Sequence, residues 1–390
     1  MRTAKHHASI EHRMPSLDGL RAVSILMVLL GHLSGTRNFP AVDLGIGNYA
    51  HLGVTVFFVI SGFLITSLLI SEQEVTGRIS LKLFYLRRTL RIFPASYSYL
   101  IVLSVLCALG LIIVPRVSMI CAFTYTINYL PGHAWQVGHL WSLSVEEQFY
   151  LLWPFAFSVL GRRKGIGAAL AVMAFAILSR AGARVFLSGT SYRDLPMFPM
   201  VADSLASGCI LALGRSWLEA QRWYLNLFRP FPALATVALV LILNRFAVYT
   251  VVGVLGTSII NIGIALLVHR CVFINRGYVG AFLNWRPIAF IGVLSYSLYV
   301  WQQLFLNRNS SSWINAFPEN ILLAAGAALA SYYVIEKPMM GLRHRLRARS
   351  RYTSVGFAPI LVDSTTAASP SRESADVVGW SSGTYASPRH

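Results

Sequence analysis

Charged residues are scarce in this chain. Only 12% of its 390 residues are Asp, Glu, Lys or Arg, about half the share of an ordinary soluble domain, whereas 55% are hydrophobic. Acidic residues are the rarest of these, with 15 Asp and Glu against 33 Lys and Arg. This composition excludes a soluble globular domain and predicts an all-α polytopic membrane protein with short loops.

Cysteine is rarer still, with four residues, and its spacing argues against a metal site. Cys107, Cys121, Cys209 and Cys271 stand far apart, mostly in apolar runs, so we expect each to serve packing and expect no metal. No cleavable signal peptide is expected, because the first apolar run ends in His32 instead of a small-residue cleavage site. The net charge of +18 suggests nucleic acid, but the basic residues lie in short loops, so we expect no nucleic-acid partner.

Ten apolar runs indicate about ten membrane-spanning helices. The membrane domain is expected to cover residues 17–338, between an N-terminal tail of residues 1–16 and a tail of residues 339–390. The second tail begins with a basic cluster, expected to bind anionic membrane lipids, and continues as a Ser-, Thr-, Ala- and Pro-rich segment expected to be disordered. The spans are expected near residues 17–35, 51–70, 94–114, 141–160, 166–183, 197–213, 231–244, 250–268, 287–306 and 319–337.

The distribution of basic residues predicts the orientation in the membrane. If the N-terminal tail is cytoplasmic, the cytoplasmic segments hold 25 Lys and Arg, the external segments hold seven, and Arg21 lies in a span. Cytoplasmic loops of membrane proteins carry just such an excess of positive charge. We therefore expect a multi-pass protein of the inner (cytoplasmic) membrane with both termini in the cytoplasm.

The first apolar run, LDGLRAVSILMVLLGH, carries three ionisable residues. On a helix, Arg21 and His32 are about 20° apart around the axis and roughly 16 Å apart along it, and Asp18 is within about 60° of Arg21. All three side chains therefore share one face. Ionisable groups at such depth in a membrane helix indicate a functional site.

Three arginines precede the third run, in LKLFYLRRTLRIFP. Arg87, Arg88 and Arg91 occupy adjacent positions on a helix, and the expected topology places them on the cytoplasmic side. Three guanidinium groups make a good clamp for an anion. The alternative is that they only anchor the helix at the membrane interface.

Two adjacent carboxylates stand near the start of the fourth run, in GHLWSLSVEEQFYLLWPF. Glu146 and Glu147 project about 100° apart on a helix, so at most one can point fully into a helix bundle. We expect this pair to take part in chemistry. A capping box formed by Ser144 and Glu147 is the alternative, although it leaves Glu146 unexplained.

Further polar residues lie within the later runs. Asp203 is expected either to pair with Arg180, Arg184, Arg193 or Arg21, or to contact a substrate. The spacing of Ser295, Tyr299 and Gln302 predicts a polar stripe on the ninth span. Glu336 and Lys337 are expected to form an interfacial pair. In the second run, Gly53, Ser61 and Gly62 favour close helix packing, or the approach of an acyl chain.

Taken together, these motifs resemble those of the acyltransferase 3 family of integral membrane O-acyltransferases. The resemblance runs over about residues 15–340, and its most specific parts are the ten-residue gap between Arg21 and His32 and the block HLWSLSVEEQFYL. It implies a ten-helix unit that passes an acyl group, most often acetyl, from cytoplasmic acyl-CoA to a hydroxyl. The acceptor implied is a carbohydrate or lipid-linked glycan of the cell envelope or destined for export.

Two positions depart from the family pattern. Many members have a His after the ninth-span Trp, where this chain has Gln302, and an amide cannot act as a base. The Arg that often stands shortly before Asp203 is replaced by apolar residues. Neither departure affects Arg21, His32 or the two carboxylates.

The resulting hypothesis assigns a role to each group. His32 acts as general base on the acceptor hydroxyl, or carries the acyl group, while Glu146 or Glu147 orients the imidazole or handles the proton. Arg21, with Asp18, positions the donor or stabilises the oxyanion of the thioester. No cofactor is expected to be permanently bound. Arg87, Arg88 and Arg91 are expected to hold the CoA phosphates, and further substrate contacts are expected from Trp141, Ser142, Asp203, Tyr299 and Gln302.

Two other functions stay open on the sequence. In a transporter or flippase, the intramembrane Arg, His and Glu would form a proton relay or substrate path. The Gly- or Pro-broken helices in two repeated halves that are typical of transporters are not evident here. The third possibility is a catalytically inactive membrane partner, which the replacement by Gln302 keeps open.

Overall fold

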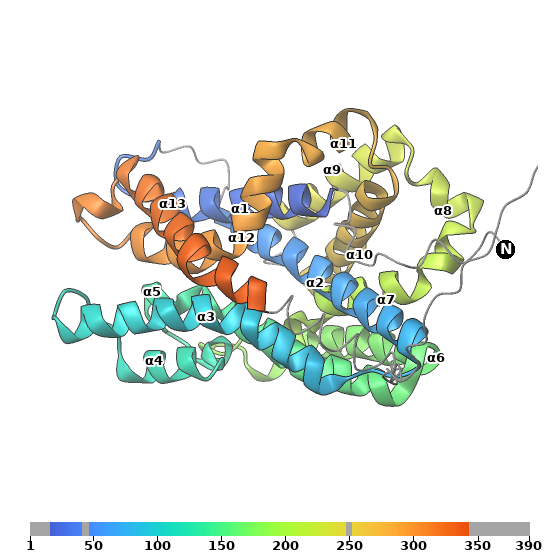
Figure 1. Cartoon of the computed structure of the whole chain (residues 1–390), viewed down its shortest axis with the longest axis horizontal. Helices are drawn as coiled ribbons and strands as arrows, with labels where there is room; N and C mark the ends of the chain where they lie inside the picture. Colours follow the sequence, from blue (N-terminus) through green and yellow to red (C-terminus); the bar gives the residue numbers. More distant parts are fainter. Residues whose placement is uncertain (1–15, 41–46, 247–251, 343–390) are drawn as a thin grey trace, which may run out of the picture. The chain divides into compact units, whose positions relative to one another are not determined.

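The computed structural model describes residues 16–40, 47–246 and 252–342, and the regular elements in these ranges are all helical. The chain divides after His344 into two units, of which the described residues belong to the first. The expectations for residues 1–15 and for the tail from residue 343 onward lie outside the described part. Figure 1 shows the arrangement of the helices.

Nine helices of 13 residues or more account for most of the described chain, and shorter elements connect them. The longer ones are α1 (Leu17–Leu33), α2 (Gly47–Thr76), α3 (Leu81–Ala108), α6 (Leu140–Phe186), α7 (Phe198–Glu219), α9 (Pro230–Phe246), α10 (Val252–Phe273), α12 (Arg286–Phe305) and α13 (Glu319–Ser331). The shorter ones are α4 (Arg116–Phe123), η1 (Ile127–Tyr129), α5 (Trp135–Gly138), α8 (Arg222–Asn226), α11 (Gly277–Asn284), η2 (Trp313–Asn315) and a π-helical turn, η3 (Tyr332–Glu336).

The all-helical prediction is confirmed for the described residues. Five of their helical stretches are long and apolar enough to cross a membrane, and Pro230–Phe246 is a shorter apolar helix. The count of ten spans therefore stays a prediction. The five stretches are Tyr49–Thr76, Leu81–Ala108, Trp135–Phe186, Gly253–Phe273 and Arg286–Phe305.

One expected boundary is wrong, and another agrees with the structure. The stretch α6 consists of two helices that meet at the non-helical backbone of Gly161 (φ 66°), which lies between the expected spans 141–160 and 166–183. The expected span 94–114 begins at Leu81 instead, because α3 continues through Pro94. Membrane helices tolerate such prolines where neighbouring groups satisfy the backbone, so a proline does not mark a helix start reliably.

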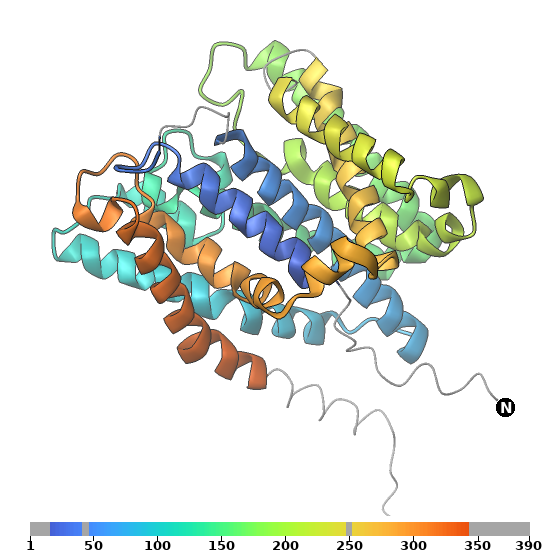
Figure 2. The same cartoon turned by 90° about the horizontal axis from the view of Figure 1, so that it is seen from above.

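Helix α1 lies at the centre of the site and packs against both α2 and α12. The latter runs parallel to it: Asn284 Oδ1 accepts a hydrogen bond from the Ser16 backbone N–H (2.8 Å), and at the opposite end Arg308 donates to the Gly31 carbonyl (3.2 Å). We call these ends of the bundle the Arg21 end and the His32 end. Figure 2 shows α1 beside α2.

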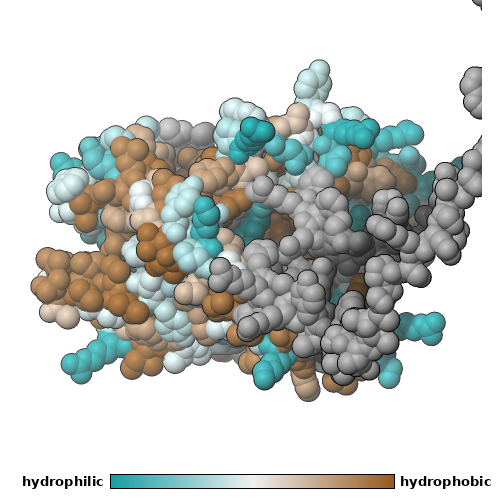
Figure 3. Space-filling model, in the orientation of Figure 1, coloured by the Kyte–Doolittle hydropathy of each residue, from teal (hydrophilic) through white to brown (hydrophobic). Residues whose placement is uncertain are grey.

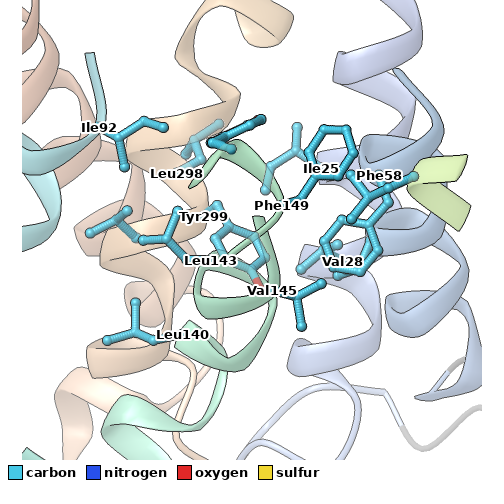
Figure 4. Packing of buried hydrophobic residues seen from close by; sticks show 14 of the residues in the cluster. Ile25, Val28, Phe58, Ile92, Leu140, Leu143, Val145, Phe149, Leu298 and Tyr299 are labelled. Atoms are coloured by element: carbon cyan, nitrogen blue, oxygen red, sulfur yellow. The ribbon is translucent and has the colours of Figure 1, made fainter. Parts of the chain in front are cut away.

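A shared apolar core fixes the register of these helices. Ile25 and Val28 of α1 meet Phe58 of α2, Val145 of α6 and Leu298 of α12 in one buried cluster, part of which is shown in Figure 4. Other large apolar side chains are exposed, among them Ile113 (88%) and Leu111 (67%), and apolar residues cover much of the left half of Figure 3. An apolar outer surface is what a bilayer environment favours.

Glycines bring α2 and α7 into direct backbone contact. A Cβ atom on Gly62 would overlap the Leu205 carbonyl oxygen, and one on Gly208 would overlap the Val59 carbonyl oxygen. Small residues allow membrane helices to approach this closely. The close-packing interpretation of Gly62 is therefore confirmed.

An ion pair joins α6, α7 and α10. Arg180 of α6 donates to Asp203 Oδ2 of α7 (2.9 Å) and to Ser258 Oγ of α10 (2.7 Å), and Ser258 donates to the same Asp203 oxygen (2.6 Å). Asp203 is fully buried. The structural alternative for Asp203 is thus the one observed, with Arg180 as its partner.

We expect Gly62→Ala to destabilise the fold by about 1–3 kcal/mol, because the α2–α7 backbone contact leaves no room for a methyl group. The midpoint of thermal unfolding of the purified protein in detergent measures this effect. Gly167→Ala in α6 is the control, since nothing lies within 4 Å of the added methyl group. Equal midpoints for the two variants would contradict the prediction.

We expect Asp203→Asn to cost about 3–5 kcal/mol, because it leaves the Arg180 guanidinium without a counter-charge in a buried position. Thermal unfolding again provides the measurement. Asp194→Asn is the matched control: it removes an ion pair with Arg193 whose side chains are 47% and 78% exposed, and such surface pairs contribute little. A similar loss for both variants would disprove the structural role of Asp203.

Candidate active site

A cavity of about 200 Å³ lies at the Arg21 end of α1. It combines two guanidinium groups, two carboxylates and two phenol rings, so it offers partners to a ligand with anionic and neutral polar parts. Helices α1, α3 and α12 and the segment beyond α13 all contribute to it. Its lining residues are Asp18, Arg21, Arg91, Val293, Tyr296, Tyr332, Glu336 and Met340.

The three arginines of α3 do not form one clamp. Arg87 pairs with Glu72 at the end of α2 (2.9 Å), and the Arg88 guanidinium lies 4.5 Å from the centre of the Tyr150 ring. Among the three, Arg91 is the one that lines the cavity. Side chains at successive helix positions diverge by about 100°, which separates Arg87 and Arg88 once α3 is packed.

The expected interfacial pair of Glu336 with Lys337 is wrong. Glu336 is 8% exposed, accepts a hydrogen bond from Ser297 Oγ and faces the cavity. The Lys337 ammonium instead lies 5.1 Å from the centre of the Tyr333 ring. Glu336 is the last residue of the π-helical turn, and such turns alter side-chain direction within a helix.

The two carboxylates of α6 lie between the ends of the bundle and point apart. Glu146 Oε1 accepts a hydrogen bond from Ser61 Oγ (2.7 Å), and Tyr150 donates to the same hydroxyl (3.2 Å). The charges of Arg88, Arg21 and Arg91 act on Glu146. Glu146 therefore links the interior of the bundle to the arginines of the Arg21 end.

Glu147 projects about 100° away from Glu146 around the helix, and its charge acts on Tyr97, Tyr125 and Tyr296. One of its oxygens is buried without a hydrogen-bond partner. The capping-box alternative is wrong, because α6 begins at Leu140 and Ser144 lies inside the helix, where it donates to the Leu140 carbonyl. Helix capping thus does not account for Glu147.

His32 meets Gln302 at the other end of α1. Its Nδ1 lies 3.1 Å from Gln302 Oε1. An amide oxygen only accepts hydrogen bonds, so Nδ1 carries the proton of the neutral imidazole and Nε2 carries a lone pair. The rings of His32 and Trp135 are nearly perpendicular (77°), with 5.9 Å between their centres, and Arg308 lies 4.9 Å from the centre of the indole.

No hydrogen bond or ion pair among the described residues joins His32 to Glu146 or Glu147. The reason is depth: α6 enters at the His32 end just after His139, so Glu146 is about 10 Å farther along the helix. The expected contact of a carboxylate with the imidazole is absent from the described structure. Gln302 takes this position instead.

The other expected substrate contacts are largely saturated. Ser142 Oγ is 2.5 Å from Tyr299 Oη, and Tyr299 donates to the His139 carbonyl (2.6 Å), so this pair joins α6 to α12. The Trp141 ring is half-buried and stacks on His51 with 5.7 Å between centres. Asp203 Oδ2 is held by Arg180 and Ser258, whereas its Oδ1 is buried without a hydrogen-bond partner.

Several residues of the site were not predicted. Ser61 and Glu336 carried a signal, since each is polar within or beside an apolar run. His139 opens the recognised motif HLWSLSVEEQFYL, and Trp135 lies just before that motif. Arg308 carried none, because a single loop arginine has no pattern. The position of Arg308 is set by the course of the loop that follows α12, which the sequence does not reveal.

Comparison with known proteins supports an acyltransferase. A family model described as "Acyltransferase domain" matches residues 14–335. O-acetyltransferase OatA of Staphylococcus aureus is 31% identical over 367 residues, 84% of this chain and 57% of that protein. The putative peptidoglycan O-acetyltransferase YrhL of Bacillus subtilis is 29% identical over 375 residues, 86% of this chain and 56% of that protein.

The chain spans little more than half the length of these two relatives. A shorter match, 39% identical over 157 residues, is found with the putative O-acetyltransferase SAS0844 of Staphylococcus aureus, and covers 36% of this chain and 24% of that protein. No solved structure matches significantly. The family match nevertheless covers most of the chain and includes α1, α3, α6 and α12, which carry the site, and the chain therefore belongs to the acyltransferase 3 family.

Proposed function

We propose that this chain is a membrane O-acetyltransferase that moves an acetyl group from cytoplasmic acyl-CoA to a hydroxyl of a cell-envelope glycan. The observation that carries the proposal is the contact of His32 Nδ1 with Gln302 Oε1, which leaves Nε2 available as a base. The names of both longer relatives support acetyl as the transferred group, and the name of YrhL supports peptidoglycan as the acceptor class.

The donor is assigned to the cavity at the Arg21 end. Arg21 and Arg91 provide charge-assisted hydrogen bonds to the anionic part of acyl-CoA, and Tyr296 and Tyr332 provide polar contacts for its neutral arm. The excess of basic residues in the loops of this side supports a cytoplasmic position for it. Ten spans, cytoplasmic termini and the inner membrane are parts of the same proposal.

The acyl transfer itself is assigned to the His32 end of the bundle, which the thioester reaches from the donor cavity at the Arg21 end. His32 Nε2 takes the proton of the acceptor hydroxyl while its oxygen attacks the thioester carbonyl. The C–S bond then breaks, the acetyl group stays on the acceptor oxygen, and the CoA thiolate receives the proton from the imidazolium. Gln302 holds the ring in the required tautomer, a part that a carboxylate plays in a catalytic triad.

Glu146 and Ser61, which lie between the Arg21 end and the His32 end, are assigned a role in charge balance. The Glu146 carboxylate balances the charges of Arg88, Arg21 and Arg91, which keeps these cations ordered within the membrane. Proton transfer through Glu146 or Glu147 is part of the proposal. Both carboxylates lie too far along α6 to orient His32 directly.

A single assay tests the proposal. Purified protein in nanodiscs receives acetyl-labelled acetyl-CoA and peptidoglycan fragments released by a muramidase, and both CoA release and labelled fragments are measured. Label on the fragments, accompanied by an equal amount of free CoA, is expected. If neither free CoA nor labelled fragments were formed, the proposal would be overturned, and a transporter or an inactive partner would be favoured.

We expect His32→Ala to lower transfer by at least about 10²-fold, because general-base catalysis contributes that much or more. The rate of labelled product at matched protein concentration is the measurement. His133→Ala, which removes another imidazole near the same end of the bundle, is the control and should keep most of the activity. Transfer at the wild-type rate by folded His32→Ala would refute the role of His32.

We expect Arg91→Ala to raise the KM for acetyl-CoA by roughly 10–100-fold, since a hydrogen bond to a charged group is worth about 1.5–3 kcal/mol. Arg87→Ala is the matched control and should change this KM much less, because Arg87 is occupied by Glu72. Steady-state kinetics at saturating acceptor separate the two. A larger effect from Arg87→Ala would contradict the assignment of the donor to the cavity.

A further inference from the structure

Three polar atoms around His32 are buried without a hydrogen-bond partner. They are Trp135 Nε1, His139 Nδ1 and Gln302 Nε2. The Trp135 ring lies against the His32 ring, and Gln302 Oε1 is hydrogen-bonded to His32. His139 lies close enough to His32 for the two imidazoles to influence each other electrostatically. Unpaired buried polar atoms are unfavourable, so three of them around one imidazole indicate that something else supplies their partners.

The ring orientation of His139 is fixed. Its Nε2 lies 3.0 Å from the Val300 carbonyl oxygen, which only accepts, so Nε2 carries the proton and Nδ1 carries a lone pair. Tyr99 and Tyr299 hold the ring from two further directions, with 5.6 Å and 5.4 Å between ring centres. His139 is only 3% exposed, so its Nδ1 acts as an oriented acceptor inside the protein.

The unpaired atoms around His32 define which ligand groups can bind to them. Gln302 Nε2 and Trp135 Nε1 donate, whereas His139 Nδ1 accepts, and His32 Nε2 carries a second lone pair. Hydroxyl groups donate and accept at once, so neighbouring hydroxyls of one sugar can pair with all of them. A carboxylate or phosphate is a poorer match, because it only accepts and would face two lone pairs.

We infer that these residues form the acceptor subsite, in which one sugar hydroxyl donates to His32 Nε2 and a neighbouring hydroxyl donates to His139 Nδ1. The hydroxyls in turn accept from Gln302 Nε2 and Trp135 Nε1. His139 and Trp135 are therefore substrate-binding residues. This inference rests on the proposed function, and it adds where and by which atoms the glycan is held.

Two substitutions of His139 separate binding from structure. In His139→Gln the amide nitrogen takes the place of Nε2 and keeps the bond to Val300, but the lone pair at Nδ1 is lost. In His139→Asn the side-chain amide lies near Nδ1 and can present its oxygen there, but the bond to Val300 is lost. A purely structural His139 would make His139→Asn the more damaging variant in every measurement.

The subsite predicts the opposite order for the acceptor. His139→Gln should raise the KM for muramidase-released peptidoglycan fragments by at least about tenfold, and change the KM for acetyl-CoA by less than about twofold. His139→Asn should keep an acceptor KM nearer that of the wild type, with a lower midpoint of thermal unfolding. An unchanged acceptor KM in His139→Gln, or the reverse order of the variants, would overturn the subsite.

Trp135 gives an independent test. Trp135→Phe keeps an aromatic ring beside His32 but removes the N–H, so it should raise the acceptor KM and leave the acetyl-CoA KM unchanged. Trp313→Phe, at a position that is 67% exposed, is the matched control and should change neither. Equal acceptor KM values for these two variants would count against the subsite.

A binding measurement separates failure of the subsite from failure of the proposed function. Isothermal titration of the same fragments into wild-type protein in nanodiscs should show binding that His139→Gln weakens by at least about tenfold. Equal binding by both would mean that only water pairs with the three atoms, and would overturn the subsite while leaving acetyl transfer intact. Absence of CoA release and of labelled product from the wild type would instead overturn the proposed function.

Discussion

The parallel contact of α1 with α12 is the constraint on which the rest of the structure depends. Ionisable side chains inside a membrane need polar surroundings from neighbouring helices, and α12 lies beside α1 at both the Arg21 end and the His32 end. Tyr296 and Val293 face the cavity of Asp18 and Arg21, and Gln302 meets His32 at the far end. Because residues of this one helix lie at both polar groups of α1, a shift of α12 along its axis would disturb the Arg21 end and the His32 end together.

The site divides into three levels along this contact. Guanidinium groups and carboxylates surround the cavity at the Arg21 end, the Glu146–Ser61–Tyr150 group lies between, and imidazole, amide and indole groups surround the His32 end. Charged groups thus become fewer toward the His32 end, where Arg308 lies beside Trp135, and neutral hydrogen-bonding groups increase. This gradient matches an anionic donor at one end and a neutral polyhydroxyl acceptor at the other, without requiring either to cross the region designed for its counterpart.

Much of this arrangement follows from local sequence, and the rest does not. Long apolar runs predict helices at nearly every place where they occur, and the face shared by Asp18, Arg21 and His32 follows from helix geometry alone. The start of α3 could not be located, because Pro94 resembles a helix boundary. The contact of His32 with Gln302 joins residues 270 positions apart, and no periodicity reports which helices become neighbours. Asp203 illustrates the intermediate case: its need for a cation was evident, but the choice of Arg180 among several arginines required the packing of α6 on α7.

The break at Gly161 has a consequence for how the two halves of α6 lie in the bundle. Glu146, before the break, bonds to Ser61 of α2, and Arg180, after it, bonds to Asp203 of α7, close to where α2 and α7 touch at Gly62 and Leu205. In one continuous helix Glu146 and Arg180 would be about 51 Å apart, so the chain reverses its direction at Gly161. The two halves of α6 therefore form an antiparallel helical hairpin, which brings the carboxylates and the buried ion pair to a similar depth in the bundle although they are far apart in the sequence.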